Sequence, residues 1–231
     1  MIVLLLITSL IAQVVQPVAV EYEQLFSTVS HTTISLNDSP GYVDPRSLGG
    51  SMLDQATETL GEPLNVIISA NSDPHVLSNK GLLDFAKSVG FAAECLNLHM
   101  GGKQLANLDG NGWFKEKIEL RQSYFPYFGT CWESYQGGNH FRAFRQLSSG
   151  AWFLAVSKEK KIKEFHKILD NGYNLGRDDL ASRALLGGSG NGYSFRTSVE
   201  WIEGLIEPGS EGVNHGIPQD GRVALLTVHS T

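Results

Sequence analysis

Two strand-like segments separated by only three residues constrain the fold of this chain most strongly. Residues 140–147 and 151–158 are rich in aromatic and aliphatic side chains, and Ser148-Ser149-Gly150 lies between them. Three residues cannot hold a crossover helix, so the two strands must pair antiparallel, as a β-hairpin. Gly150 stands where such a turn needs a positive φ. The sequence therefore predicts a sheet that is at least partly antiparallel.

A compact α/β unit precedes this hairpin. Residues 64–70 form a β-branched run, which predicts a buried strand. Asp73-Pro74 is typical of a helix start, the apolar residues of 82–89 recur at helical spacing, and Gly90 supplies a C-terminal stop. Strand and helix therefore follow one another here.

The remaining pattern indicates one domain. Two late strands are predicted at residues 193–206 and 222–228, and the chain contains no internal repeat. Residues 61–231 are predicted to form a single α+β domain, with a mixed, mostly antiparallel sheet packed against a few helices. Residues 21–60 are rich in polar residues, glycine and proline and predict an irregular N-terminal leader.

The N-terminus and the cysteines indicate the extracellular space. Residues 1–20 carry no charge and hold an apolar stretch too short for a membrane span, which favours a cleaved signal peptide over a buried strand or an uncleaved anchor. In an oxidising compartment Cys95 and Cys131 are expected to form a disulfide, although two buried thiols remain the alternative. Asn37 begins the single N-x-S/T sequon and is a candidate glycosylation site.

Charge and hydropathy exclude two classes of partner. The chain has 231 residues, with 18 Lys and Arg against 24 Asp and Glu, for a formal net charge of −6. This acidic balance argues against non-specific binding of nucleic acid, which needs basic surface. No later window approaches the length and apolarity of a membrane span, so no stable span is expected once the signal is removed.

The common cofactor and metal motifs are absent. The glycine-rich residues 186–192 lack the Lys-Ser/Thr of a phosphate loop and the third glycine of a dinucleotide fingerprint. No two histidines have the H-x-x-x-H spacing, and no C-x-x-C occurs. The sequence therefore predicts no cofactor and no metal, although a site built from distant segments stays open.

A set of polar residues between 137 and 178 is the candidate ligand site. His140 and Arg142 are two apart on a predicted strand and so project from the same face, beside the glycine pair Gly137-Gly138. If the second strand of the hairpin runs back beside the first, residues 166–178 reach the end of the sheet where His140 and Arg142 lie. Two arginines and two histidines with few acids would suit an anion; the alternative is a purely structural role. The predicted ligand-binding residues are Asn139, His140, Arg142, His166, Asp170, Arg177 and Asp178.

Several longer motifs occur along the chain: FAAECL at 91–96, DGNG at 109–112, FGTC at 128–131, GGNHFR at 137–142 and NGYNLGRD at 171–178. Together they resemble a secreted protein family that is common in basidiomycete fungi and has no assigned biochemical activity. The resemblance spans residues 63–185 and extends almost to the C-terminus. The resemblance implies a secreted protein.

More distantly, the chain resembles the LssY C-terminal domain of bacterial membrane-associated proteins. His140, Arg142, Arg177 and Asp178 would match its His-x-Arg strand and its Arg-Asp helix. This resemblance implies a fold and a candidate site, but no reaction.

Three functions are consistent with these observations. The leading hypothesis is an extracellular binding module for a small anionic or polar ligand, such as a sugar or a phosphorylated head group. The second is a secreted hydrolase acting on a phosphoester, with His140 or His166 as general acid–base and Arg142 and Arg177 holding the developing charge. The third is a structural or effector-like surface protein without a small-molecule site.

Overall fold

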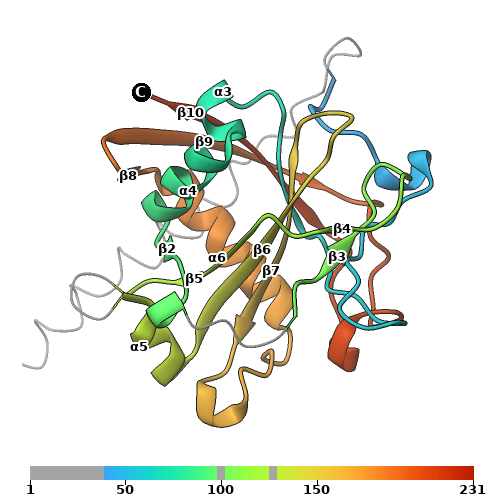
Figure 1. Cartoon of the computed structure of the whole chain (residues 1–231). Coiled ribbons are helices and arrows are strands. Elements are labelled where there is room, and N and C mark those ends of the chain that lie inside the picture. Colours follow the sequence, from blue (N-terminus) through green and yellow to red (C-terminus); the bar gives the residue numbers. More distant parts are fainter. Residues whose placement is uncertain (1–38, 98–101, 125–128) are drawn as a thin grey trace, which may run out of the picture. The chain divides into compact units, whose positions relative to one another are not determined.

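A mixed sheet packed against helices forms the part of the chain that the computed structural model describes (Figure 1). The described residues are 39–97, 102–124 and 129–231. The predicted α+β class is confirmed, including its central hairpin and its disulfide.

Contacts divide the chain into the units Met1–Asp38 and Ser39–Thr231, and only the second contains described residues. The signal peptide predicted at 1–20 and the sequon at Asn37 lie outside the described residues. Residues 39–60 belong to the second unit and are mostly irregular.

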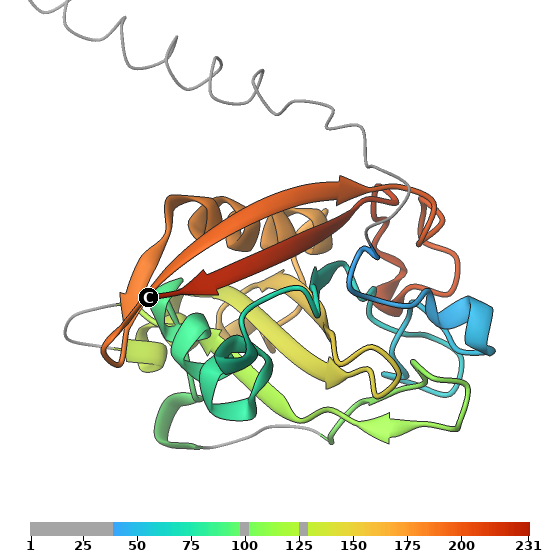
Figure 2. The same cartoon turned by 90° about the horizontal axis from the view of Figure 1, so that it is seen from above.

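The main sheet has eight strands and is curled, so that its strands change direction across it (Figure 2). Neighbouring strands are antiparallel except for β1 and β10, which are parallel. A separate two-stranded sheet pairs β3 (Leu105–Ala106) with β4 (Phe114–Lys115). In spatial order the main sheet contains β2 (Phe91–Ala92), β5 (Ile118–Gln122), β6 (Gly138–Arg145), β7 (Trp152–Glu159), β1 (Val66–Ile68), β10 (Val223–Ser230), β9 (Tyr193–Ile202) and β8 (Gly188–Gly190).

The helices are short apart from α6. The α-helices are α3 (Pro74–Leu77), α4 (Asn79–Ser88), α5 (Gly129–Gln136) and α6 (Gly172–Leu186). The 3₁₀ helices are η1 (Pro45–Leu48), η2 (Cys95–Asn97), η3 (Ile162–Glu164) and η4 (Asn214–Gly216). The predicted helix before Gly90 is split, because Ser78 ends α3 and its side chain caps the start of α4 by accepting from the amide of Gly81.

The predicted hairpin is confirmed. β6 and β7 pair antiparallel from Gly138 opposite Glu159 to Arg145 opposite Trp152. Gly150 has a φ of 81°, the left-handed conformation that its place in the turn requires. Both strands are buried along most of their length, because each also pairs with a further strand, β6 with β5 and β7 with β1.

The two faces of the sheet bury separate apolar cores. On one face, Leu154 and Leu226 pack with residues of α4 and α6 such as Phe85 and Leu180. On the other face, the strand residues pack beneath loops, as in the contacts among Met52, Ile67, Phe144, Phe153 and Leu205. Strand side chains alternate between faces, so the residues of β6 that share a face with Phe144 point toward this loop-covered side.

Cys95 and Cys131 form the predicted disulfide, which joins η2 to α5. The described residues contain no helix that is both long and apolar enough to cross a bilayer.

Candidate functional site

His140 and Arg142 project together from β6, as predicted, but each is already bound to carboxylates. Nε2 of His140 lies 2.9 Å from Oε1 of Glu119, and Nη2 of Arg142 lies 2.9 Å from the same oxygen. Arg142 also donates through Nη1 to Glu116 at 2.8 Å. Glu119 comes from β5, the strand beside β6. The register of these two strands places its carboxyl group within reach of both His140 and Arg142.

Arg121 is a second centre of charge on the same face, and sequence reasoning missed it. Its Nη1 donates to Glu159 at 2.7 Å and its Nε donates to Glu94 at 2.8 Å. The same Nη1 lies 3.7 Å from Oε1 of Glu133, whose side chain is completely buried. Arg121 therefore joins three acids that are far apart in the sequence.

These groups form one continuous network, which we call the buried charge cluster. Its members are Glu62, Glu94, Glu116, Glu119, Arg121, Glu133, His140, Arg142, Glu159 and His166. The expectation of few acids around His140 and Arg142 is wrong, because carboxyl groups outnumber guanidinium groups in the cluster. This composition favours a cation over the anion that the sequence indicated.

Burial shifts the ionisation of several members. It lowers the pKa of His140 to about 3, so this imidazole is neutral near pH 7. It also lowers the pKa of His166. Burial raises the pKa of Glu133 to about 7, although the nearby Arg121 acts in the opposite direction. The cluster thus holds neutral histidines beside Glu133, whose charged form is disfavoured by burial.

His166 reaches the cluster from the loop that follows β7, as predicted. The amide of Lys160 donates to the carbonyl of Lys167 and closes this loop, which carries η3. Nδ1 of His166 then lies 3.6 Å from Oε2 of Glu159 and 3.9 Å from Oε1 of Glu133. Glu133, Glu159 and His166 each offer one atom to a group whose members all lie within 4.8 Å of one another.

Three further predicted site residues lie elsewhere. Asn139 points to the opposite face of β6 and donates to Asp179 of α6. Asp170 is exposed, and its side chain has no hydrogen bond or ion pair within the described ranges. Asp178 is about half exposed and binds Arg177.

Arg177 is buried at a separate place, where it binds α6 to the segment before β10. Its guanidinium donates to both carboxylate oxygens of Asp220, at 2.5 and 2.8 Å, and to the carbonyl of Arg222 at 2.7 Å. Its Cζ also lies 5.1 Å from the centre of the Trp201 ring. With its donors engaged in this way, Arg177 has the contacts of a structural brace.

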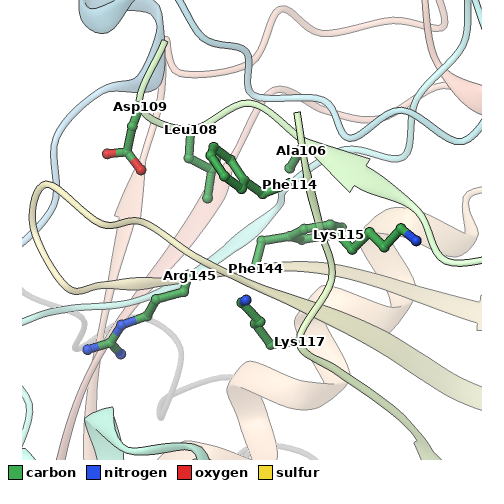
Figure 3. A pocket seen from close by; sticks show the side chains of 8 residues that line it. All are labelled: Ala106, Leu108, Asp109, Phe114, Lys115, Lys117, Phe144 and Arg145. Carbon is green, nitrogen blue, oxygen red and sulfur yellow. The ribbon is translucent and has the colours of Figure 1, made fainter. Parts of the chain in front are cut away.

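A pocket beside β4 offers cationic side chains but little space. Figure 3 shows Lys117 and Arg145 near an apolar wall that includes Phe114 and Phe144, with Lys115 pointing away from them. The pocket has room for about one water molecule. Nη1 of Arg145 is also occupied by the carbonyl of Leu77, at 2.6 Å. This pocket therefore does not fit the predicted anionic ligand.

A larger cavity, of about 180 Å³, lies among the residues before β1. About half of the Trp113 side chain is exposed, and it forms one wall. No lining residue of this cavity is basic. The other lining residues are Ser51, Leu53, Asp54, Gln55, Thr57, Glu58, Thr59, Leu60, Gly61 and Gly212.

Comparison of the chain with protein families, with curated proteins and with solved structures found no match. The resemblances to the basidiomycete family and to the LssY C-terminal domain therefore stay predictions.

Proposed function

We propose that this chain is a secreted binding module for a small, uncharged polar ligand such as a sugar. The observation that carries the proposal is the cavity of about 180 Å³ beside Trp113. For comparison, a cavity of about 150 Å³ is enough to hold benzene. The size suits a ligand of about one ring and is small for a larger molecule.

The lining of this cavity is complementary to a ring that carries hydroxyl groups. Trp113 offers a broad apolar face on which the carbon–hydrogen face of a ring can pack. The side chains of Gln55, Glu58 and Thr59 have no hydrogen-bond partner within the described part of the chain, so their donors and acceptors are free for a ligand. The carboxylate of Glu58 disfavours a phosphorylated ligand by repulsion.

Two further observations support secretion. The disulfide between Cys95 and Cys131 is typical of proteins in an oxidising compartment. The apolar stretch at residues 1–20 suits a signal peptide.

The phosphoester hydrolase has less support. His140 is buried and its pKa of about 3 makes it a weak base at neutral pH. Arg177, which would hold the developing charge in that mechanism, is engaged by Asp220 and Arg222 instead.

Titration of the protein with glucose, galactose, mannose and N-acetylglucosamine, followed by ligand-observed NMR, tests the proposal. We expect at least one of these sugars to bind, and Trp113→Ala to weaken it about tenfold or more. Phe114→Ala is the matched control, because Phe114 is the next residue, is equally exposed and lines a different pocket. Binding by none of the sugars, or equal binding by Trp113→Ala, contradicts the proposal and favours the structural or effector-like role.

A further inference from the structure

Three potential metal ligands from three separate elements converge within the buried charge cluster. Glu133 lies on α5, Glu159 ends β7, and His166 follows η3. Their ligand atoms lie within 4.8 Å of one another, and Nδ1 of His166 lies 3.6 Å from Oε2 of Glu159 and 3.9 Å from Oε1 of Glu133. Ligands that each lie about 2.0–2.2 Å from one ion are separated from each other by about 3–4 Å, so small side-chain adjustments suffice.

Glu133 is the unusual member of this group. Its side chain is fully buried, and neither of its carboxylate oxygens has a hydrogen-bond partner among the described residues. Nδ1 of His166 is also buried without a hydrogen-bond partner. A buried carboxyl group without hydrogen bonds costs free energy, and such a group in a native protein calls for an explanation.

Glu133 is the least well matched of the acids around Arg121. Arg121 donates hydrogen bonds to Glu94 and Glu159, whereas its Nη1 lies 3.7 Å from Oε1 of Glu133 and makes no hydrogen bond to it. Arg121 is directed mainly toward Glu94 and Oε2 of Glu159. The 3.6 Å separation between His166 and Glu159 is measured to this same Oε2, and the other oxygen, Oε1, lies 3.4 Å from Nδ1 of His140.

The fold holds the group in place from two sides. Cys131, two residues before Glu133, is bonded to Cys95 and attaches α5 to η2. Gly138 leaves the space that the Glu133 side chain fills, because a Cβ atom at Gly138 would lie 2.8 Å from Cγ of Glu133. The predicted room beside the glycine pair is thus taken by a carboxylate of the chain itself.

We propose that Glu133, Glu159 and His166 bind one divalent transition-metal ion. Two carboxylates with one imidazole suit Zn²⁺, Mn²⁺ or Fe²⁺, whereas Ca²⁺ and Mg²⁺ prefer oxygen ligands alone. Three protein ligands leave a coordination position for water. His166 is the most exposed of the three, with 16% of its side chain accessible, and gives the ion a path from solvent.

Calorimetric titration of the oxidised, EDTA-treated and dialysed protein with ZnCl₂ tests this proposal. We expect one Zn²⁺ per chain, and a loss of affinity of more than about 100-fold in both Glu133→Gln and His166→Ala, since even the loss of a group behind a ligand costs about 10–100-fold. His229→Ala is the control, because His229 also pairs with a carboxylate, that of Asp73, but on the surface. It should bind like the wild type.

The thermal midpoint gives a second readout that does not depend on calorimetry. Saturating Zn²⁺ should raise the midpoint of the wild type and of His229→Ala, and leave that of Glu133→Gln unchanged. Glu133→Gln keeps the size of the side chain and removes a charge that has no hydrogen bond, so it is expected to fold. Absence of binding by the wild type, or wild-type affinity in folded Glu133→Gln, overturns the proposal.

Discussion

The side chain of Glu133 occupies the space that a Cβ atom on Gly138 would need, with Cγ of Glu133 only 2.8 Å from that position. Gly138 begins β6, and Glu133 lies on the helix just before it. The glycine therefore admits a carboxylate to the centre of the buried charge cluster. This relationship connects a motif of the sequence to the proposed metal site, and it can be tested directly.

Gly138→Ala should displace Glu133. The added methyl would also lie 3.0 Å from the hydroxyl of Tyr124 and 3.2 Å from Oε1 of Gln122, so three side chains crowd it and Glu133, the nearest, has to shift. We expect Zn²⁺ affinity to fall about tenfold or more in calorimetry. Gly102→Ala is the control, because a Cβ atom there meets nothing within 4 Å. Unchanged affinity in Gly138→Ala would show that Glu133 does not need this space.

Glu133→Met should stabilise the metal-free protein. An apolar side chain of similar length removes a buried carboxyl group that lacks hydrogen bonds, and we expect the free energy of unfolding in urea with EDTA to rise by about 1 kcal/mol. Glu94→Met should lower it instead, because Glu94 accepts a hydrogen bond from Arg121 at 2.8 Å. A loss of stability in Glu133→Met equal to that in Glu94→Met would argue that Glu133 is an ordinary partner of Arg121.

The disulfide should carry a large share of the stability. It joins residues that are 36 apart, and closing such a loop contributes about 3–4 kcal/mol in the chain-entropy model. The double variant Cys95→Ser, Cys131→Ser should lose about that much in urea denaturation. Alkylation of the native wild type should modify no cysteine, and two modified thiols would refute the bond.

Arg177 should act as a structural brace. Arg177→Ala leaves Asp220 without its two-pronged partner and opens space beside Trp201, so we expect a loss of about 2–4 kcal/mol in urea denaturation. Asp178→Asn should cost less than about 1 kcal/mol, because Asp178 is half exposed. A stable Arg177→Ala protein that has lost binding of an anion such as phosphate would restore the anion-site hypothesis.

The ion pair between Arg177 and Asp220 makes the stability depend on pH. Burial acts to raise the pKa of Asp220, but hydrogen bonds from Arg177 and from the amide of Arg222 lower it more, so the net shift is downward from 3.8. A carboxyl whose pKa is lower in the folded state stabilises the protein above its unfolded pKa, and this contribution is lost as the pH falls through the folded value. The difference in stability between wild type and Asp220→Asn should therefore stay constant from about pH 5 to 7 and shrink below about pH 4. A difference that grows on acidification would have the wrong sign.

Local patterns were sufficient to predict the main elements of the fold. The hairpin follows from two apolar runs and a turn glycine, and the helix before Gly90 follows from its apolar spacing and its start signal. β5 was not predicted. Its residues Ile118 and Leu120 face the apolar core, but Glu119 and Arg121 alternate with them and are buried among charges, which only the tertiary structure reveals.

The site was predictable only in part, for a similar reason. The shared face of His140 and Arg142 follows from the period of a strand. The acids around them, Glu62, Glu116, Glu119 and Glu159, come from segments far apart in the sequence. No pattern in the sequence indicates that these segments meet. One local signal was present in the sequence: the Cys131-Trp132-Glu133 segment precedes Gly137-Gly138 and so places an acid beside both a crosslink and a pair of residues without side chains.

Diffraction from crystals grown with ZnCl₂, measured at the zinc absorption edge, tests the central claim most directly. We predict an anomalous peak about 2.0–2.2 Å from a carboxylate oxygen of Glu133, a carboxylate oxygen of Glu159 and Nδ1 of His166. Peaks confined to surface histidines such as His229, with no density between Glu133 and His166, would contradict it.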